Sequence, residues 1–141
     1  DLEISNLGPR DVGSPLHLST VPDDGIGNFT PDEARVLYHL NFVPGQEIRA
    51  DLSFEKAGPR ERIFFRPERA RAAIVTCGGL CPGLNNVIRS VFFQLHHNYG
   101  VAEVLGIRYG YRGLNPERGD APVRLTPESV ESILRPSPDR S

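Results

Sequence analysis

The clearest hydrophobic pattern in the chain runs from residue 72 to residue 109. Residues 72–76 form a short apolar run, which is typical of a central parallel strand buried on both faces. A glycine-rich stretch follows, and apolar residues then recur every three or four positions, at Leu84, Val87, Ile88, Val91, Phe92 and Leu95. This period predicts a helix with one apolar stripe, ending near residues 98–100. Residues 101–109 predict a second strand, so the segment has the length of one right-handed, parallel strand–helix–strand unit.

Weaker patterns precede this unit. Residues 1–28 mix Gly, Pro, Asp and Ser with scattered apolar positions and predict an extended arm. The stretch Thr30-Pro31-Asp32-Glu33 combines a capping Thr, a Pro at the first helical position and a following acidic residue, and so predicts a helix to about His39. Residues 46–66 alternate weakly around Gly58-Pro59 and predict a hairpin or two short strands.

A last helix and a tail complete the predicted organisation. Thr126-Pro127-Glu128 is a second helix start, with Val130, Ile133 and Leu134 as the apolar edge of the helix. The predicted parts are an N-terminal extension with one short helix (1–41), a hairpin-like lead-in (42–71), a first βαβα portion (72–135) and a tail (136–141). The predicted fold class is α/β: the start of a parallel, Rossmann-like, three-layer sheet preceded by an irregular extension.

Composition narrows the classes of partner. A net charge of −2, from 16 basic and 18 acidic residues, gives no field of one sign to attract nucleic acid or a membrane surface. No apolar run approaches the roughly 20 residues of a membrane helix, and the first residues lack the pattern of a signal peptide. Cys77 and Cys81 are the two cysteines, too few for the disulfide framework of a secreted protein. We therefore expect a cytoplasmic protein with no nucleic-acid or membrane partner.

Residues 78–85 combine a glycine-rich turn with the start of a helix, which favours phosphate binding by backbone N–H groups and the helix dipole. The P-loop pattern does not fit, because Leu84 and Asn85 occupy the positions of its Lys and hydroxyl residue. The dinucleotide pattern does not fit either. Its glycine spacing differs, and the next strand ends without the acidic residue that takes a ribose hydroxyl.

A third pattern, Gly-Gly-x-x-Pro-Gly-x-Asn at residues 78–85, leads to a family. Together with residues 106–114 (Gly-Ile-Arg-Tyr-Gly-Tyr-Arg-Gly-Leu), it resembles the start of a phosphofructokinase. Leu80-Cys81 and residues 57–61 are similar to the plant, protist and spirochaete group of that family. The resemblance covers roughly residues 42–133. It implies the N-terminal portion of an ATP-dependent 6-phosphofructokinase, which uses ATP and Mg²⁺ to phosphorylate fructose 6-phosphate in glycolysis.

The resemblance also implies roles for individual residues. Gly78 and Gly79 would bind the nucleotide phosphates, and Tyr111 would lie near the nucleotide. Arg89 is a candidate for an effector site or for a structural role, and Asn85 is expected to bond within the turn. No catalytic residue or metal ligand is expected within this chain. The family's glycine-Asp-glycine loop and its Thr-Ile-Asp segment, which supply those groups, do not occur in it.

Three interpretations stay open at this point. The first is part of an ATP-dependent enzyme that forms a dimer or tetramer when full length. The second is a pyrophosphate-dependent phosphofructokinase, because the residue that separates the two donors lies outside this sequence. The third, from another class, is a truncated, non-catalytic nucleotide-binding or interaction module.

Overall fold

The computed structural model describes residues 7–41, 43–77, 83–117 and 119–133. The chain divides into two compact units, Asp1–Phe64 and Phe65–Ser141. This division differs from the predicted one, because most of the lead-in groups with the N-terminal extension and not with the strand–helix–strand unit. Leu134 and the predicted tail, 136–141, lie outside the described residues.

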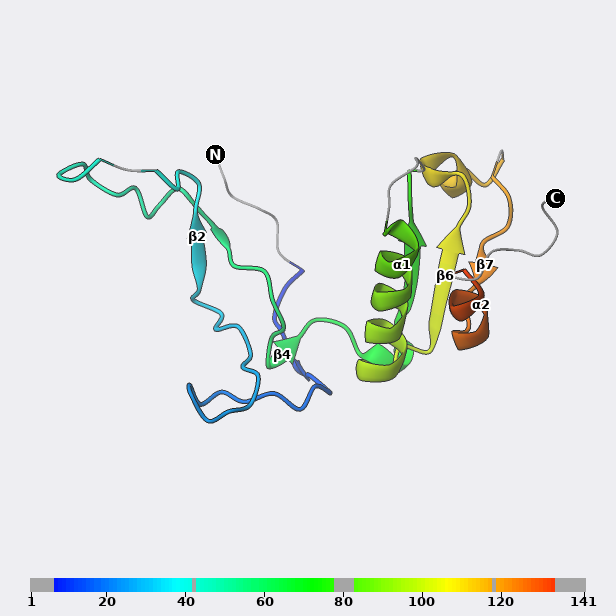
Figure 1. The fold of residues 1–141 in the computed structure, drawn as a ribbon, viewed down its shortest axis with the longest axis horizontal. Helices are drawn as coiled ribbons and strands as arrows, with labels where there is room; N and C mark the ends of the chain where they lie inside the picture. The colour runs from blue at the N-terminus through cyan, green and yellow to red at the C-terminus, as the bar shows by residue number, and fades with distance from the viewer. Residues whose placement is uncertain (1–6, 42, 78–82, 118, 134–141) are drawn as a thin grey trace. The chain divides into compact units, whose positions relative to one another are not determined.

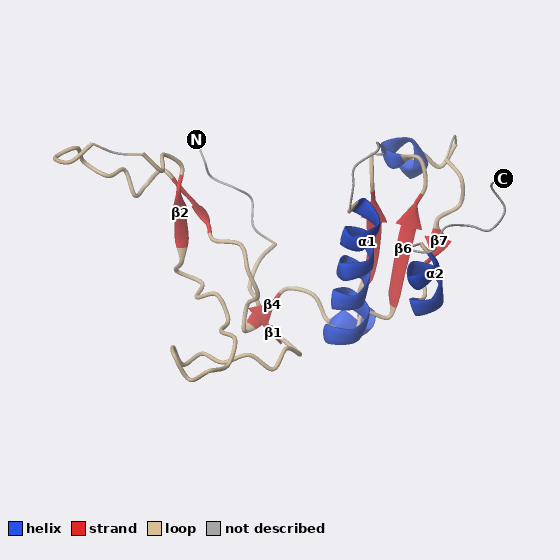
Figure 2. Ribbon diagram, in the orientation of Figure 1, coloured by secondary structure: helices blue, strands red, loops and turns tan. Residues whose placement is uncertain are grey.

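The first unit consists of long connections joined by two short antiparallel strand pairs (Figure 2). Strand β1 (Val12–Gly13) pairs with β4 (Arg62–Ile63), and β2 (Arg35–Leu37) pairs with β3 (Ser53–Glu55). The predicted helix between Thr30 and His39 is wrong, since this stretch makes one turn and then becomes β2. Of the two alternatives predicted for residues 46–66, the structure confirms two short strands and not a hairpin. The strands are β3 and β4, which pair with β2 and β1 and not with each other.

Long-range ion pairs explain why the stretch from Thr30 to His39 does not form the predicted helix. The Arg10 guanidinium contacts the carboxylates of both Asp32 and Glu55, the latter at 2.8 Å. Arg60 approaches the same Asp32 carboxylate at 3.6 Å. Arg10 and Arg60 are largely buried, so these contacts fix the chain around residue 32 more firmly than an isolated helical turn could.

The second unit is a three-stranded sheet with helices (Figure 1). In chain order it contains η1 (Pro67–Arg69), β5 (Arg71–Val75), α1 (Leu84–Phe93), a π-helical continuation η2 (Gln94–Asn98), β6 (Glu103–Ile107), η3 (Gly110–Leu114), β7 (Val123–Arg124) and α2 (Pro127–Ser132). β5 and β6 are parallel neighbours, with Ala73 opposite Leu105 and Val75 opposite Ile107, which confirms the predicted strand–helix–strand unit and the α/β class. β7 was not predicted. It pairs antiparallel with β6, so the described sheet is mixed.

The hydrophobic core of this unit lies between the sheet and the two α-helices. Its buried members are Phe92, Val101, Val104 and Val130. Helix α2 is held by the predicted cap, in which the Thr126 hydroxyl accepts the N–H of Ser129 at 3.2 Å and the Ser129 hydroxyl accepts the N–H of Thr126 at 2.8 Å. Hydrogen bonds from its own backbone N–H and from Thr126 lower the pKa of Glu128 in the first turn.

The apolar stripe of α1 is narrower than predicted. Phe92 is 1% exposed, and Leu84 and Ile88 are half-buried, but Val87 is 57% exposed and Val91 is 41% exposed. Leu84, Ile88 and Phe92 are spaced four residues apart and share one face of the helix. Val87 and Val91 each precede one of these residues, so they are turned about 100° away from that face. The sequence pattern overestimated the stripe because both valines fit a helical period without contacting the core.

Candidate functional site

The carboxyl ends of β5 and β6 lie side by side at one edge of the sheet (Figure 1). Thr76 and Cys77 follow β5, and Tyr109 and Gly110 follow β6. In open α/β sheets, ligands bind outside the carboxyl ends of the strands. The predicted phosphate contacts Gly78 and Gly79 come next in the chain but lie outside the described residues. Their roles therefore stay predictions.

Helix α1 begins at Leu84, directly after the glycine motif of residues 78–83. Gly83 is its N-cap, with φ 89° and ψ −6°, a left-handed conformation that glycine adopts without steric cost. The first turn of α1 contains no acidic residue. The positive end of this helix is therefore not neutralised by its own side chains, which suits an anionic ligand.

Two glycines fix the loop that follows β6. Gly110 is buried, and a Cβ there would lie 3.2 Å from both the Cα of Cys77 and the carbonyl oxygen of Thr76. At Gly113, a Cβ would overlap the carbonyl oxygen of Arg108. The absence of a side chain lets Gly110 pack against the end of β5 and lets Gly113 pack against the end of β6. The backbone of β6 is thus joined closely to the residues just before the phosphate turn.

Tyr111 lies within this loop, on the 3₁₀ turn η3, and its side chain is 74% exposed. The structure therefore places it near the expected edge, with a ring that is not part of the core. Its contact with a nucleotide stays a prediction. Sequence reasoning did not select Tyr109, which is 70% exposed in the same loop and has a left-handed backbone. An aromatic residue directly before a loop glycine was the available signal.

The structure shows a partner of Asn85 that the sequence did not suggest, because its side-chain amide donates to the carbonyl oxygen of Ile133 at 3.2 Å. Its expected bond within the turn involves residues outside the described ranges and stays a prediction. Ile133 is the C-cap of α2. Asn85 therefore connects the start of the helix behind the phosphate turn to the end of the last helix, 48 residues away.

Arg89 lies on α1 in a stack of side chains. Its guanidinium is 4.7 Å from the centre of the Phe93 ring, and Phe93 stacks on His97 with ring centres 5.0 Å apart and planes 8° from parallel. The Arg89 Nε atom is buried and has no hydrogen-bond partner among the described groups. These contacts favour the structural alternative for Arg89, and the effector role stays a prediction.

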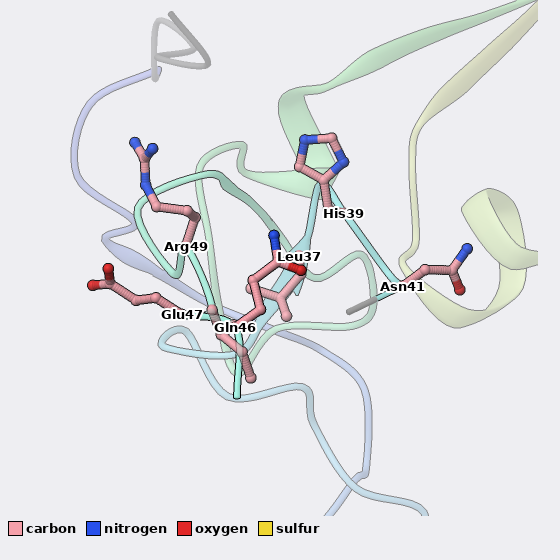
Figure 3. Close-up of a pocket in the computed structure, with 7 residues that line it drawn as sticks. Leu37, His39, Asn41, Gln46, Glu47 and Arg49 are labelled. Carbon is pink, nitrogen blue, oxygen red and sulfur yellow. The ribbon is translucent and has the colours of Figure 1, made fainter. Parts of the chain in front are cut away.

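A cavity of about 210 Å³ in the first unit offers a second place to look for a ligand (Figure 3). It is lined by Leu37, His39, Asn41, Gln46, Glu47, Ile48 and Arg49. Arg49 is paired with Asp51 through bonds of 2.8 Å and 2.6 Å, which raise the pKa of Arg49 and lower the pKa of Asp51. Figure 3 shows Asn41 extending away from Glu47 and Arg49. The polar groups that line the cavity do not point toward one common place, and Asp51 neutralises the charge of Arg49. We therefore assign no ligand to this cavity.

Two other properties concern only the part of the chain that the structure describes. There, His, Cys, Asp and Glu side chains form no group of three or more that could hold a metal ion. None of the helices within those ranges has the length and apolar character of a membrane span.

Comparison with known proteins agrees with the motifs. Residues 71–137 match the family model Phosphofructokinase. The chain is 38% identical over 135 residues to the ATP-dependent 6-phosphofructokinase of Borreliella burgdorferi, an alignment covering 94% of this chain and 30% of the relative. It is 56% identical over 95 residues to the ATP-dependent 6-phosphofructokinase of Entamoeba histolytica, covering 67% of this chain and 22% of the relative. It is 45% identical over 93 residues to the ATP-dependent 6-phosphofructokinase 4, chloroplastic, of Arabidopsis thaliana, covering 66% of this chain and 17% of the relative. The chain thus spans less than a third of the length of these relatives.

Proposed function

We propose, from the membership of residues 71–137 in the phosphofructokinase family, that this chain is the N-terminal portion of an ATP-dependent 6-phosphofructokinase. The complete enzyme would transfer the γ-phosphoryl group of ATP to O1 of fructose 6-phosphate. The observation that carries this proposal is that β5 and α1 flank the family's glycine motif within the matched segment. The relatives' names specify ATP, so we do not propose pyrophosphate as the donor.

Within this chain, the proposed role is to bind the phosphoryl donor. Gly78 and Gly79 would let the phosphates approach the backbone, since glycine has no Cβ in the way. The start of α1 would add favourable electrostatic potential for the phosphates. Tyr111 would lie against the nucleotide. Its exposed ring at the carboxyl edge of the sheet supports this role, because the ring has no place in the core.

Phosphoryl transfer needs further groups. Mg²⁺ must be held by carboxylates, a base must accept the proton of the attacking hydroxyl, and cations must stabilise the moving phosphoryl group. The family's glycine-Asp-glycine loop and Thr-Ile-Asp segment, which would supply those groups, do not occur in this sequence. We therefore propose that the metal ligands and the base belong to a part of the protein beyond this chain. A cytoplasmic dimer or tetramer stays the proposed form of the whole protein, with a plastid as the alternative compartment that the name of one relative suggests.

An activity assay of the full-length protein tests this proposal. Fructose 1,6-bisphosphate formation would be followed with fructose 6-phosphate, Mg²⁺ and either ATP or pyrophosphate. We expect turnover with ATP at about 1–100 per second, the usual range for kinases. Turnover with pyrophosphate only would contradict the proposed donor. Nucleotide binding without turnover would favour the non-catalytic module.

The role of Tyr111 is tested by Tyr111→Ala in the same protein. Loss of the ring should raise the KM for ATP about tenfold, the effect of about 1.4 kcal/mol of lost stacking, while the KM for fructose 6-phosphate changes little. Tyr38→Ala is the matched control, because Tyr38 is 55% exposed but belongs to the first unit. A Tyr111→Ala variant that melts at a markedly lower temperature, with equal effects on both substrates, would show that the ring is needed for folding instead.

A further inference from the structure

Tyr109 has an unusual backbone conformation for its residue type. Its φ is 61° and its ψ is 33°, in the left-handed region. Among the described residues, Asp23 is the one other non-glycine residue with a positive φ. An aromatic side chain is disfavoured there by steric contact between its Cβ and the backbone, whereas Gly, Asn and Asp tolerate this region much better.

The next residue continues the turn. Gly110 is also left-handed, with φ 58°, and a Cβ on it would lie 3.2 Å from the Cα of Cys77 and from the carbonyl oxygen of Thr76, closer than most Cβ contacts. Tyr109 and Gly110 are thus two successive left-handed residues soon after β6 ends, where the loop packs against the end of β5. This turn gives position 109 an unusual backbone but gives no reason for a tyrosine there.

Packing does not account for the choice either. The side chain of Tyr109 is 70% exposed, so burial does not offset the cost of the conformation. Within the described ranges, its hydroxyl has no hydrogen-bond partner and its ring contacts no other ring. Yet the fold holds this ring at the carboxyl edge of two parallel strands, two residues before the exposed ring of Tyr111.

We infer that Tyr109 is a second aromatic contact for the base of the nucleotide donor, acting beside Tyr111. The inference rests on the proposed function, which puts the donor at this edge. An exposed aromatic ring supplies a flat apolar face on which a purine can stack. Two such rings in one loop would favour a donor that has a base, whereas pyrophosphate has none to stack on. Tyr109 would thus add to the affinity for a donor that has a base, beside the residue outside this sequence that separates the two donors.

The test uses the full-length protein with Tyr109→Asn and Tyr109→Phe. Asn removes the ring and tolerates the left-handed backbone, so the melting temperature should stay equal or rise. The dissociation constant for a non-hydrolysable ATP analogue, measured by calorimetry without sugar, should rise about tenfold in Tyr109→Asn and less than twofold in Tyr109→Phe. Competition by pyrophosphate should be unchanged. Tyr38→Asn, in the first unit, should change neither the dissociation constant for the analogue nor the competition by pyrophosphate.

Several results would overturn the inference. One is an unchanged dissociation constant for the analogue in Tyr109→Asn. Another is a lowered melting temperature with equal losses for the analogue and pyrophosphate, because it would show that the ring supports the fold. Because binding is measured without transfer, an inactive protein that still loses analogue affinity in Tyr109→Asn would contradict the proposed enzyme while supporting the inference. A native protein that binds no analogue would contradict both.

Discussion

At the scale of single residues, the carboxyl edge of the sheet depends as much on absent side chains as on present ones. Gly83 and Gly110 take left-handed backbone conformations that cost glycine little, whereas Tyr109 takes the same region at a steric cost. Gly113 is needed for a different reason, because its neighbours leave no room for a Cβ. The glycines therefore fix the path of the loop, and the tyrosines supply the surface that a ligand could contact.

Gly113→Ala tests this dependence on space. The new Cβ would overlap the carbonyl oxygen of Arg108 and lie 2.7 Å from the Cγ2 of Ile107. Since the first of these is a backbone atom, the loop itself must shift, and we expect the free energy of unfolding in urea to fall by about 2 kcal/mol or more. Gly13→Ala is the control, because a Cβ there meets nothing within 4 Å. Equal effects of the two substitutions would show that the loop yields without cost.

At the scale of elements, sequence patterns succeeded where they were long and continuous. The run of β5, the helical period of α1 and the apolar strand β6 were all visible, and their parallel pairing followed from the length of the connection. The helix signal at residues 30–33 failed, because four residues of local preference compete with ion pairs to distant arginines. β7 could not be predicted, because two residues are too few to show the alternation of apolar and polar positions that marks a strand. It is located by pairing with β6 and by the adjoining bond from the N–H of Leu125 to the carbonyl oxygen of Val104, at 2.9 Å.

The residues of the candidate site likewise include some that the local sequence suggests and others that depend on the three-dimensional structure. The predicted roles of Gly78, Gly79 and Tyr111 came from the match of their spacing to a family motif, and they stay predictions. Tyr109 was missed because its significance lies in a backbone angle, which the sequence does not display. The partner of Asn85 was missed because it is a carbonyl group from a distant helix. Features that depend on three-dimensional proximity could not be obtained from local pattern.

Asn85→Ala tests the connection between α1 and α2. Removing the amide leaves the carbonyl oxygen of Ile133 without this donor, and we expect the free energy of unfolding in urea to fall by about 1 kcal/mol. Asn86→Ala is the matched control, because Asn86 is the next residue of α1 and is also exposed, and the described contacts give its side chain no hydrogen bond. If both variants unfold at the same urea concentration, the bond contributes nothing measurable in solution.

At the scale of the whole molecule, the described core is small. The buried hydrophobic side chains among the described residues are the four that gather in the second unit. On β5 and β6, Ala72, Ile74 and Val104 contact this core. The alternate positions on those strands, at residues 73, 75, 105 and 107, belong to the other face of the sheet, because successive side chains of a strand point to opposite faces. There Ala73 is exposed and the other three side chains are half-buried.

The last prediction follows from this limited core and from the chemistry of transfer. The purified 141-residue chain should form no detectable fructose 1,6-bisphosphate from ATP, Mg²⁺ and fructose 6-phosphate. The predicted turn at residues 78–83 would give phosphate a few hydrogen bonds and the field of one helix, but the sequence lacks the family motifs that supply the metal ligands and the base. Loss of metal, base and phosphoryl-clamping cations together removes several orders of magnitude in rate. The full-length protein, assayed beside the chain at equal concentration, is the control. Turnover by the chain within tenfold of an ordinary kinase would place the catalytic groups inside these 141 residues and contradict the proposed division of the site.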